Sequence, residues 1–265
     1  MRGAHVMIEG LTIRHGRSRD RADGADIALR NIDLDLQPGS FTALIGPSGC
    51  GKSTLVNAIA GFTPPAQGRV RIDGAEVHGP PPEVGVIFQQ YALFPWLTVL
   101  GNVRFGLKQF RLGRRAEIER AEAALAEVGL ADLARRYPQQ LSGGQRQRVA
   151  IARTFATGPR VLLMDEPFGA LDAQTRVDMQ ELLLALWRKR RATVLFVTHD
   201  VDEAILLADH VRVMSHAPGQ LVMHYELTQP RPRKLSRAGR DLLMLREDIL
   251  GLLRPPGIFR PEHLS

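Results

Sequence analysis

The chain of 265 residues is 44% hydrophobic and 24% charged, which is enough apolar material for one large domain core with a smaller helical insertion. No apolar run approaches the roughly 18–20 residues that cross a bilayer, and residues 1–10 lack the apolar centre of a signal peptide, so we expect the chain to stay in the cytoplasm. The formal net charge of +7 suits nucleic acid or an anionic membrane surface, but much of the excess lies in arginine clusters at 111–115, 188–191 and 231–240, which are typical of solvated faces.

A phosphate-binding motif is the first chemical feature along the chain. The apolar run Phe41–Ile45 predicts a buried parallel strand, and Leu55–Ala60 predicts a helix. Between them, Gly46-Pro-Ser-Gly-Cys-Gly-Lys-Ser53 fits the pattern G-x-x-x-x-G-K-[ST]. Its glycines let backbone N–H groups turn toward phosphate oxygens, so the order of strand, loop and helix predicts a triphosphate site. A glycine-rich turn that matches by accident is the alternative.

Individual residues of this loop have distinct predicted roles. Lys52 supplies a positive charge for the β- and γ-phosphates, and Ser53 offers a hydroxyl to Mg²⁺, at a helix start whose dipole favours anions. Cys50 is the only cysteine, so an internal disulfide is excluded. Its thiol either blocks ATP when alkylated or, as we prefer, is simply a small group that fits the loop. The predicted ATP contacts here are Gly46, Pro47, Ser48, Gly49, Cys50, Gly51, Lys52, Ser53 and Thr54.

An apolar loop precedes a stretch that we expect to be helical, residues 90–157, in which apolar side chains such as Ala121 and Leu125 recur at helical spacing. The loop contains two bulky aromatic residues, Phe94 and Trp96. They either pack under the helical insertion or form a socket for a helix of a partner protein.

A second glycine motif, Leu141-Ser-Gly-Gly-Gln145, stands just before a helix predicted over Arg146–Ala156. Ser142 and the glycine amides are expected to form a second phosphate-binding helix start. Because the first loop already surrounds one triphosphate, we expect the second to serve the nucleotide of another subunit.

Two further apolar runs place polar residues at the carboxyl edge of a sheet, where open α/β sheets bind ligands. Val161–Met164 leads into the acidic pair Asp165 and Glu166, and Thr193–Val197 leads to His199. Asp165 suits Mg²⁺, Glu166 suits the polarisation of a water for in-line attack on the γ-phosphorus, and the histidine is expected to reach the γ-phosphate. The structural alternatives are a strand-ending turn for the acids and a capping or surface role for the histidine.

The remainder of the chain completes the core and adds a tail. A helix is predicted around Val177–Trp187, Pro230–Arg233 predicts a linker, and Leu242–Leu253 predicts a short amphipathic helix that packs back on the core. We therefore expect four parts: the first half of a nucleotide-binding core with an N-terminal β subdomain (1–89), a helical subdomain (90–157), the second half of the core (158–216) and a C-terminal tail (217–265).

Taken together, these motifs resemble, over most of the chain, the ATPase subunits of ABC transporters. The resemblance implies an α/β fold of the P-loop NTPase type, with a RecA-like parallel sheet core, an antiparallel β subdomain and an inserted α-helical subdomain. It also implies a head-to-tail homodimer in which the second glycine motif closes on the ATP of the partner. The residues implied in that contact are Ser142, Gly143, Gly144 and Gln145.

Three further residues are assigned only by position in the family pattern. Gln89 matches the glutamine that touches Mg²⁺ and the attacking water, and Asp172 lies in the loop that crosses the dimer seam. His15 stands where the family usually has an aromatic residue stacked on adenine; imidazole stacks less broadly.

A finer resemblance, to the nitrate, sulfonate and taurine importer group, is carried by Phe94–Trp96, Asp165–Arg176, Met179–Trp187 and Pro230–Arg233. It implies the ATP-binding and ATP-hydrolysing subunit of an ABC importer for a small anion, with sulfonate or taurine ahead of nitrate. The implied cofactors are ATP and Mg²⁺. The implied partners are a second copy of the chain, transmembrane permease subunits and, indirectly, a periplasmic or extracellular substrate-binding protein, with the complex at the cytoplasmic face of a bacterial inner membrane.

Two other classes of protein share parts of this pattern. A soluble ABC-type ATPase that acts on nucleic acid or ribosomes would account for the basic charge, but such proteins usually carry a long coiled coil or two ATPase halves, so we expect no nucleic acid partner. A scaffold that binds ATP without turnover is the second, and the presence of Lys52, Glu166 and His199 argues against it.

Overall fold

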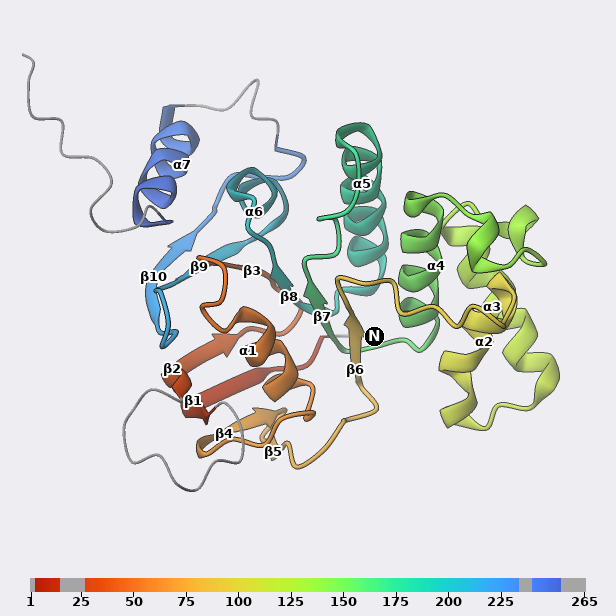
Figure 1. Ribbon diagram of the computed structural model, residues 1–265, viewed down its shortest axis with the longest axis horizontal. Coiled ribbons are helices and arrows are strands. Elements are labelled where there is room, and N and C mark those ends of the chain that lie inside the picture. Colours follow the sequence, from red (N-terminus) through yellow and green to blue (C-terminus); the bar gives the residue numbers. More distant parts are fainter. Residues whose placement is uncertain (1–2, 15–26, 234–239, 254–265) are drawn as a thin grey trace, which may run out of the picture.

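The computed structural model describes residues 3–14, 27–233 and 240–253 and contains two sheets (Figure 1). The larger sheet has the strand order β10-β9-β3-β8-β7-β6. Its strands are β3 (Phe41–Ile45), β6 (Val84–Ile87), β7 (Val161–Asp165), β8 (Thr193–Val197), β9 (His210–Met214) and β10 (Leu221–Glu226). All neighbours pair parallel except β10, which is antiparallel to β9. The central strands are buried on both faces, which explains their continuous apolar runs.

The smaller sheet is antiparallel, with the strand order β2-β1-β4-β5. Its strands are β1 (Val6–Arg14), β2 (Ile27–Leu36), β4 (Gln67–Ile72) and β5 (Ala75–Glu76). Strand β2 alternates between buried and exposed side chains over its second half, from Asn31 to Leu36, as expected for a sheet with one face on the core.

Helices cover the larger sheet on both faces. Seven α-helices are present among the described residues: α1 (Lys52–Ile59), α2 (Val99–Leu107), α3 (Arg114–Glu127), α4 (Gly143–Ala156), α5 (Ala173–Arg190), α6 (Val201–Leu207) and α7 (Arg240–Leu253). Short 3₁₀ turns occur at Lys108–Phe110, Ala131–Leu133 and Pro138–Gln140. Helix α1 and the antiparallel sheet share one hydrophobic core with one face of the parallel sheet, and α2–α6 share the other core with the opposite face. None of these helices is both long and apolar enough to span a bilayer.

The expected α/β architecture is confirmed, with differences at helix ends. Helix α4 begins at Gly143, three residues before the predicted Arg146, because Ser142 caps it. Helix α5 extends beyond Val177–Trp187 at both ends, from the cap Asp172 to Arg191 in the left-handed conformation. Polar and charged residues in its first and last turns hid these turns from the apolar pattern.

The predicted linker Pro230–Arg233 has no helix or strand and follows β10, as expected, but the prediction that its arginines are solvated is wrong. Arg233 is only 8% exposed, and its guanidinium donates to four backbone carbonyl oxygens at 2.5–3.0 Å, those of Ile205, Ala208, Leu227 and Gln229. Arg231 donates to the carbonyl of Leu207 and to Asp209.

The predicted packing of the last helix is confirmed. Leu242 and Ile249 of α7 are buried in the same core as α6, and Arg246 Nε lies 2.6 Å from Asp202 Oδ1 on α6.

Candidate functional site

The loop Gly46–Ser53 joins the carboxyl end of β3 to α1 and has the backbone expected of a phosphate cradle. Gly49 and Gly51 have φ angles of 75° and 100°, a region that side chains rarely adopt. A Cβ atom on Gly51 would come within 2.6 Å of a methyl of Leu29 on β2, whereas one on Gly49 would meet nothing within 4 Å. No side chain caps α1, so its first N–H groups remain available to an anion.

Lys52 and Ser53 stand at the start of α1. Lys52 is only 7% exposed, and its ammonium donates to the carbonyl oxygens of Gly46 and Pro47 at 2.8 and 2.9 Å. The Ser53 hydroxyl is hydrogen-bonded to Asp165, and burial raises the pKa of that carboxyl, an effect that Lys52 opposes.

The donor set at this edge fits Mg²⁺ bound together with a triphosphate. Ser53 and Asp165 are oxygen donors, which Mg²⁺ prefers. Within the described residues no group of three or more His, Cys, Asp or Glu side chains could hold a metal by itself. Mg²⁺ is usually bound by one or two carboxylates together with waters and substrate phosphates, so a sparse protein shell is the expected form of such a site.

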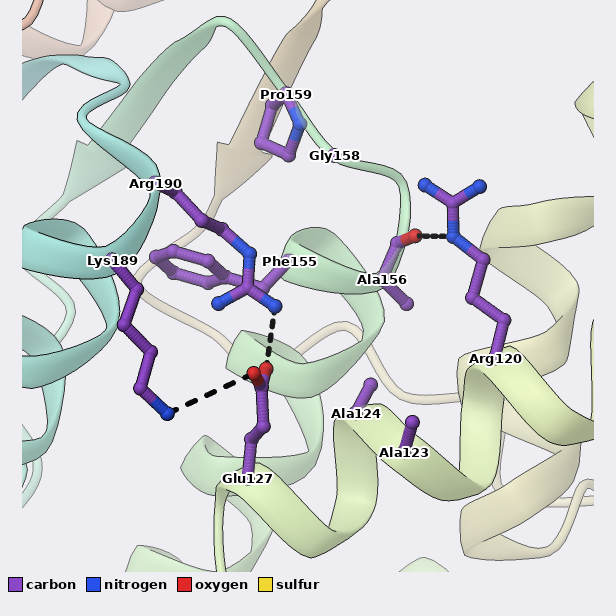
Figure 2. A pocket seen from close by; sticks show the side chains of 10 residues that line it. All are labelled: Arg120, Ala123, Ala124, Glu127, Phe155, Ala156, Gly158, Pro159, Lys189 and Arg190. Carbon is purple, nitrogen blue, oxygen red and sulfur yellow. Dashed lines mark hydrogen bonds and ion pairs between the residues drawn. The ribbon is translucent and has the colours of Figure 1, made fainter. Parts of the chain in front are cut away.

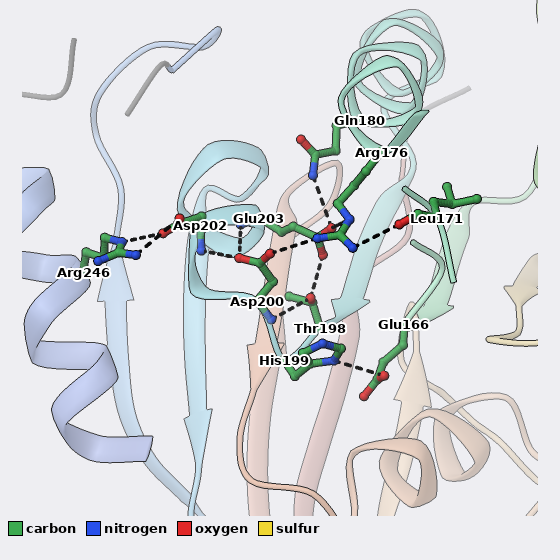
Figure 3. Close-up of polar contacts among 10 residues, drawn as sticks. All are labelled: Glu166, Leu171, Arg176, Gln180, Thr198, His199, Asp200, Asp202, Glu203 and Arg246. Carbon is green, nitrogen blue, oxygen red and sulfur yellow. Dashed lines mark hydrogen bonds and ion pairs between the residues drawn. The ribbon is translucent and has the colours of Figure 1, made fainter. Parts of the chain in front are cut away.

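Gln89, Glu166 and His199 converge from three neighbouring strands, following β6, β7 and β8. Figure 1 shows these strands, and Figure 3 shows Glu166 and His199. Glu166 Oε2 lies 3.5 Å from Gln89 Nε2 and 3.2 Å from His199 Nδ1. These distances bring together the three residues that the sequence suggested for catalysis. A water beside Glu166 would also be within reach of an amide and an imidazole.

Glu166 is also held in an unusual backbone conformation, with φ at 44°. Its N–H donates to the carbonyl of Val197 on β8 at 3.0 Å, which ties the residue to the strand that leads to His199. Strained residues of this kind cluster at functional sites, where the surrounding structure fixes them.

Sequence reasoning missed the side chains that support this site, chiefly Arg176, Thr198 and Glu203. Thr198 lies in the His199 loop itself, and Arg176 of α5 and Glu203 of α6 surround this loop (Figure 3). Burial raises the pKa of Glu203, while the hydrogen bond from the Thr198 hydroxyl opposes that rise. The available signal was a glutamate on the otherwise apolar face of a short helix.

The second glycine motif lies at the start of α4 and forms a capping box. The Ser142 hydroxyl accepts from the Gln145 N–H at 3.2 Å, and Gln145 Oε1 accepts from the Ser142 N–H at 3.0 Å. A Cβ on Gly144 would come within 2.5 Å of Thr175 in the first turn of α5. The motif therefore packs beside the helix that Asp172 caps.

Asp172 is the N-cap of α5, the helix whose first turn packs beside Gly144. Its carboxylate accepts from the Thr175 N–H at 3.0 Å, and this hydrogen bond lowers the pKa of Asp172. Among the described residues, no hydrogen bond or ion pair joins segments 142–145 and 46–54. His15, the candidate adenine contact, lies outside the described residues.

The apolar loop before α2 borders an open groove of about 330 Å³ between β6, α2 and α4. Phe94 packs on Phe105 with ring centroids 4.4 Å apart, while Trp96 is 71% exposed. The fully buried Asn102 holds the loop by bonding both the N–H and the carbonyl of Phe94. The predicted packing under the helical insertion is therefore confirmed for Phe94, whereas Trp96 is exposed, and the socket for a partner helix stays a prediction.

Comparison with known proteins gives consistent matches. The family model described as ABC transporter matches residues 29–169. The chain is 49% identical to the taurine import ATP-binding protein TauB of Chromobacterium violaceum, over 84% of this chain and 85% of that protein. It is 45% identical to the nitrate import ATP-binding protein NrtD of Synechocystis, over 78% of each. The dimeric structure of MJ0796, a bacterial ABC transporter cassette, aligns with a TM-score of 0.72 at 32% identity, over 85% of this chain and 100% of that one.

The phosphate loop, the convergent candidate residues and these matches agree, and the chain belongs to the ABC transporter ATPases, in the group that includes nitrate and taurine import ATP-binding proteins.

Proposed function

We propose that this chain is the ATP-hydrolysing subunit of an importer for a small anion, at the cytoplasmic face of the cell membrane. The observation that carries the chemistry is the convergence of Gln89, Glu166 and His199 on one point at the sheet edge that also holds Lys52 and Ser53. The observation that carries transport is the identity of 45–49% to proteins named for nitrate and taurine import.

In the proposed reaction, the amides of Gly46–Ser53 and the ammonium of Lys52 bind the phosphates of ATP. Ser53, Gln89 and Asp165 would hold Mg²⁺, which when bound would supply charge neutralisation for the phosphates. Glu166 orients and polarises a water for in-line attack, and His199 donates a hydrogen bond toward the γ-phosphate. The γ-phosphoryl group passes to water, and ADP and phosphate leave.

The proposed working form is a head-to-tail pair. Within the described residues, segment 142–145 has no bond to the phosphate loop of its own chain, whereas Ser142 is exposed at the start of a helix, where it can meet a second nucleotide. In this arrangement Ser142–Gln145 of one subunit contacts the ATP of the other, and Asp172 lies at the seam between them. A relative of the same fold that was solved as a dimer supports the pairing of two copies.

The groove beside β6 and α2 is the proposed contact with a transmembrane permease. It is lined by aromatic and apolar side chains, with Phe88, Trp96 and Phe105 exposed at or near its rim. Exposed aromatic clusters of this kind mark sites where a partner helix lays down its apolar face. Because Phe88 immediately precedes Gln89, the occupant of the groove would act on a residue of the ATP site.

The first experiment measures steady-state phosphate release and the size of the Glu166→Gln protein, with and without ATP and Mg²⁺. We expect ATP binding to persist, turnover to fall by about 10²–10⁴, as for loss of a positioned base, and a dimer to appear only with ATP. Normal turnover in this variant would show that the catalytic residue is wrongly assigned.

The transport part of the proposal has its own test. Affinity capture of the chain from detergent-solubilised membranes should recover a multi-span permease, and Trp96→Ala should weaken that capture. The ATPase rate of the recovered complex should then rise with a taurine-loaded or sulfonate-loaded binding protein more than with a nitrate-loaded one. Recovery of ribosomes or nucleic acid without a permease would favour the soluble ABC-type alternative.

A further inference from the structure

A cluster of charged and polar side chains lies behind Glu166 and His199, between α5 and α6 (Figure 3). Glu203 of α6 is only 5% exposed and accepts from Thr198 Oγ1 at 2.6 Å and from Gln180 Nε2 at 3.2 Å. The Thr198 oxygen also accepts from the Asp200 N–H at 3.0 Å. Glu203 thereby fixes a three-residue loop whose middle residue is His199.

Arg176 of α5 contacts both sides of this cluster. Its Nη2 donates to the carbonyl of Leu171 at 3.2 Å, and its Nη1 lies 3.5 Å from Asp200 Oδ2. Leu171 directly precedes Asp172, the residue proposed for the dimer seam. One guanidinium therefore touches the seam loop and the His199 loop at the same time.

Arg176 and Glu203 lie close together but do not form a hydrogen bond, so a second arrangement in which they do is within reach. Arg176 Nε is buried without a hydrogen-bond partner and lies 3.8 Å from Glu203 Oε1. Charge-assisted N–H···O bonds are about 2.7–2.9 Å long, so a relative movement of about 1 Å would form one. A buried unpaired N–H favours such closure, because leaving it unpaired is costly.

We propose that Arg176 and Glu203 are positioning residues that transmit closure of the dimer seam to His199. Displacement of the seam loop moves the Leu171 carbonyl and with it the Arg176 guanidinium. Arg176 then pairs with Glu203, and Glu203 sets the Thr198 hydroxyl and the loop that places His199 against Glu166. Neither residue touches the nucleotide. The inference rests on the proposed roles of Glu166, His199 and Asp172.

The test compares Arg176→Gln, Glu203→Gln and the double variant in the full chain. For each single variant we expect kcat to fall about 10- to 100-fold, while KM for ATP and the calorimetric ATP affinity change less than about twofold, because binding groups are untouched. The double variant should fall no further than the worse single one, because the two residues act as a unit. Matched controls are Arg115→Gln and Glu119→Gln, the same changes in an exposed pair on α3, which should leave kcat unchanged.

Arg176→Lys separates positioning from charge. Relative to Arg176→Gln, we expect Arg176→Lys to regain the positive charge and the thermal midpoint of unfolding. A single ammonium cannot contact Leu171, Asp200 and Glu203 together, so kcat should stay low. Full recovery of kcat by lysine, additive losses in the double variant, or losses that merely parallel unfolding would each overturn the inference. If Glu166→Gln also keeps normal turnover, the proposed function fails. If Glu166→Gln is inactive while Arg176→Gln and Glu203→Gln are normal, only this inference fails.

Discussion

Glu166 carries two constraints at once, a left-handed backbone and a carboxylate held between Gln89 and His199. A non-glycine residue at positive φ costs roughly 1–2 kcal/mol, which the surrounding structure must offset. The fold therefore tolerates a destabilising backbone at position 166, and this backbone places the carboxylate between Gln89 and His199. Glycine and alanine substitutions separate the cost of the backbone from the role of the carboxylate.

Glu166→Gly and Glu166→Ala are both expected to lose turnover, because both remove the carboxylate. Their stabilities should differ: glycine adopts φ of 44° without strain, so the glycine variant should unfold with a free energy up to about 1 kcal/mol higher than the alanine variant, after allowance for glycine's greater unfolded entropy. Denaturant unfolding of the two variants checks this. Equal stability would mean that position 166 carries no backbone strain.

At the scale of elements, helix starts serve both folding and the candidate site. Ser142 caps α4 with its hydroxyl and is also the proposed contact to the nucleotide of the partner. Thr98 caps α2 in the same way, by accepting from the Gly101 N–H at 3.1 Å, but it lies outside the proposed ATP site. The two caps form a natural pair for comparison.

Ser142→Ala and Thr98→Ala should each reduce the free energy of unfolding by about 1 kcal/mol, the usual cost of losing a cap. Only Ser142→Ala should also slow ATP turnover, with little change in the nucleotide affinity of the monomer, because its target lies across the dimer. Unfolding curves, phosphate release and nucleotide titration on both variants provide the readouts. A large loss of monomer affinity in Ser142→Ala would contradict the composite site.

The helical insertion is attached to the core partly by polar contacts around a cavity of about 270 Å³ (Figure 2). Glu127 of α3 pairs with Arg190 at 2.5 Å and with Lys189 at 4.0 Å, both in the last turn of α5. A further polar contact lies within the insertion, where Arg120 of α3 donates to the carbonyl of Ala156 at the end of α4 at 2.7 Å. An interface held by polar contacts around a cavity can rearrange more readily than a closely packed apolar interface.

Glu127→Gln should loosen this attachment, and hydrogen exchange of the α3 amides should accelerate about two- to fivefold, as expected for a partly exposed ion pair worth up to about 1 kcal/mol. Glu119→Gln is the control, since its partner Arg115 lies on the same helix. Equal protection of α3 in both variants would show that Glu127 does not hold the insertion.

At the scale of the whole molecule, the C-terminal segment acts as a brace for α6. Arg233 satisfies the carbonyl oxygens of Ile205 and Ala208 near the end of α6, and Arg246 of α7 pairs with Asp202 near its start. Helix α6 follows closely after His199, so residues beyond 230 support the loop that carries this histidine.

Arg233→Leu should therefore lower the free energy of unfolding by about 2–4 kcal/mol, because it leaves buried carbonyl groups without donors. Arg246→Ala should cost no more than about 1 kcal/mol, because its ion pair is partly exposed. Thermal and denaturant unfolding of both variants measure the difference. Unchanged stability of the Arg233→Leu protein would mean that water can replace the guanidinium at these carbonyls.

The sequence predicted the central strands, the phosphate loop and the placement of Glu166 and His199 at one sheet edge, because buried parallel strands read as apolar runs and the sheet edge gathers the residues that follow them. Gln89 is assigned only by its position in the family pattern. It did not predict Arg233 or Glu203 as buried. Charged residues are seldom buried without partners, and their partners here are carbonyls and hydroxyls from other elements, which local patterns do not encode. The additional first turns of α4 and α5 are stabilised by capping side chains and contain no apolar repeat, so the apolar spacing did not predict them.

The strand order has a consequence for how the protein is made. Strand β3, which carries the phosphate loop, pairs only with β8 and β9 in the described part of the chain, and the first of these begins at Thr193. During synthesis the loop therefore leaves the ribosome long before either neighbour exists. Sheet pairing across so large a sequence separation must wait for loop closure, which is slow. The nascent chain thus exposes its nucleotide-binding segment first. The ATP site can be complete only after β8 and His199 have been synthesised.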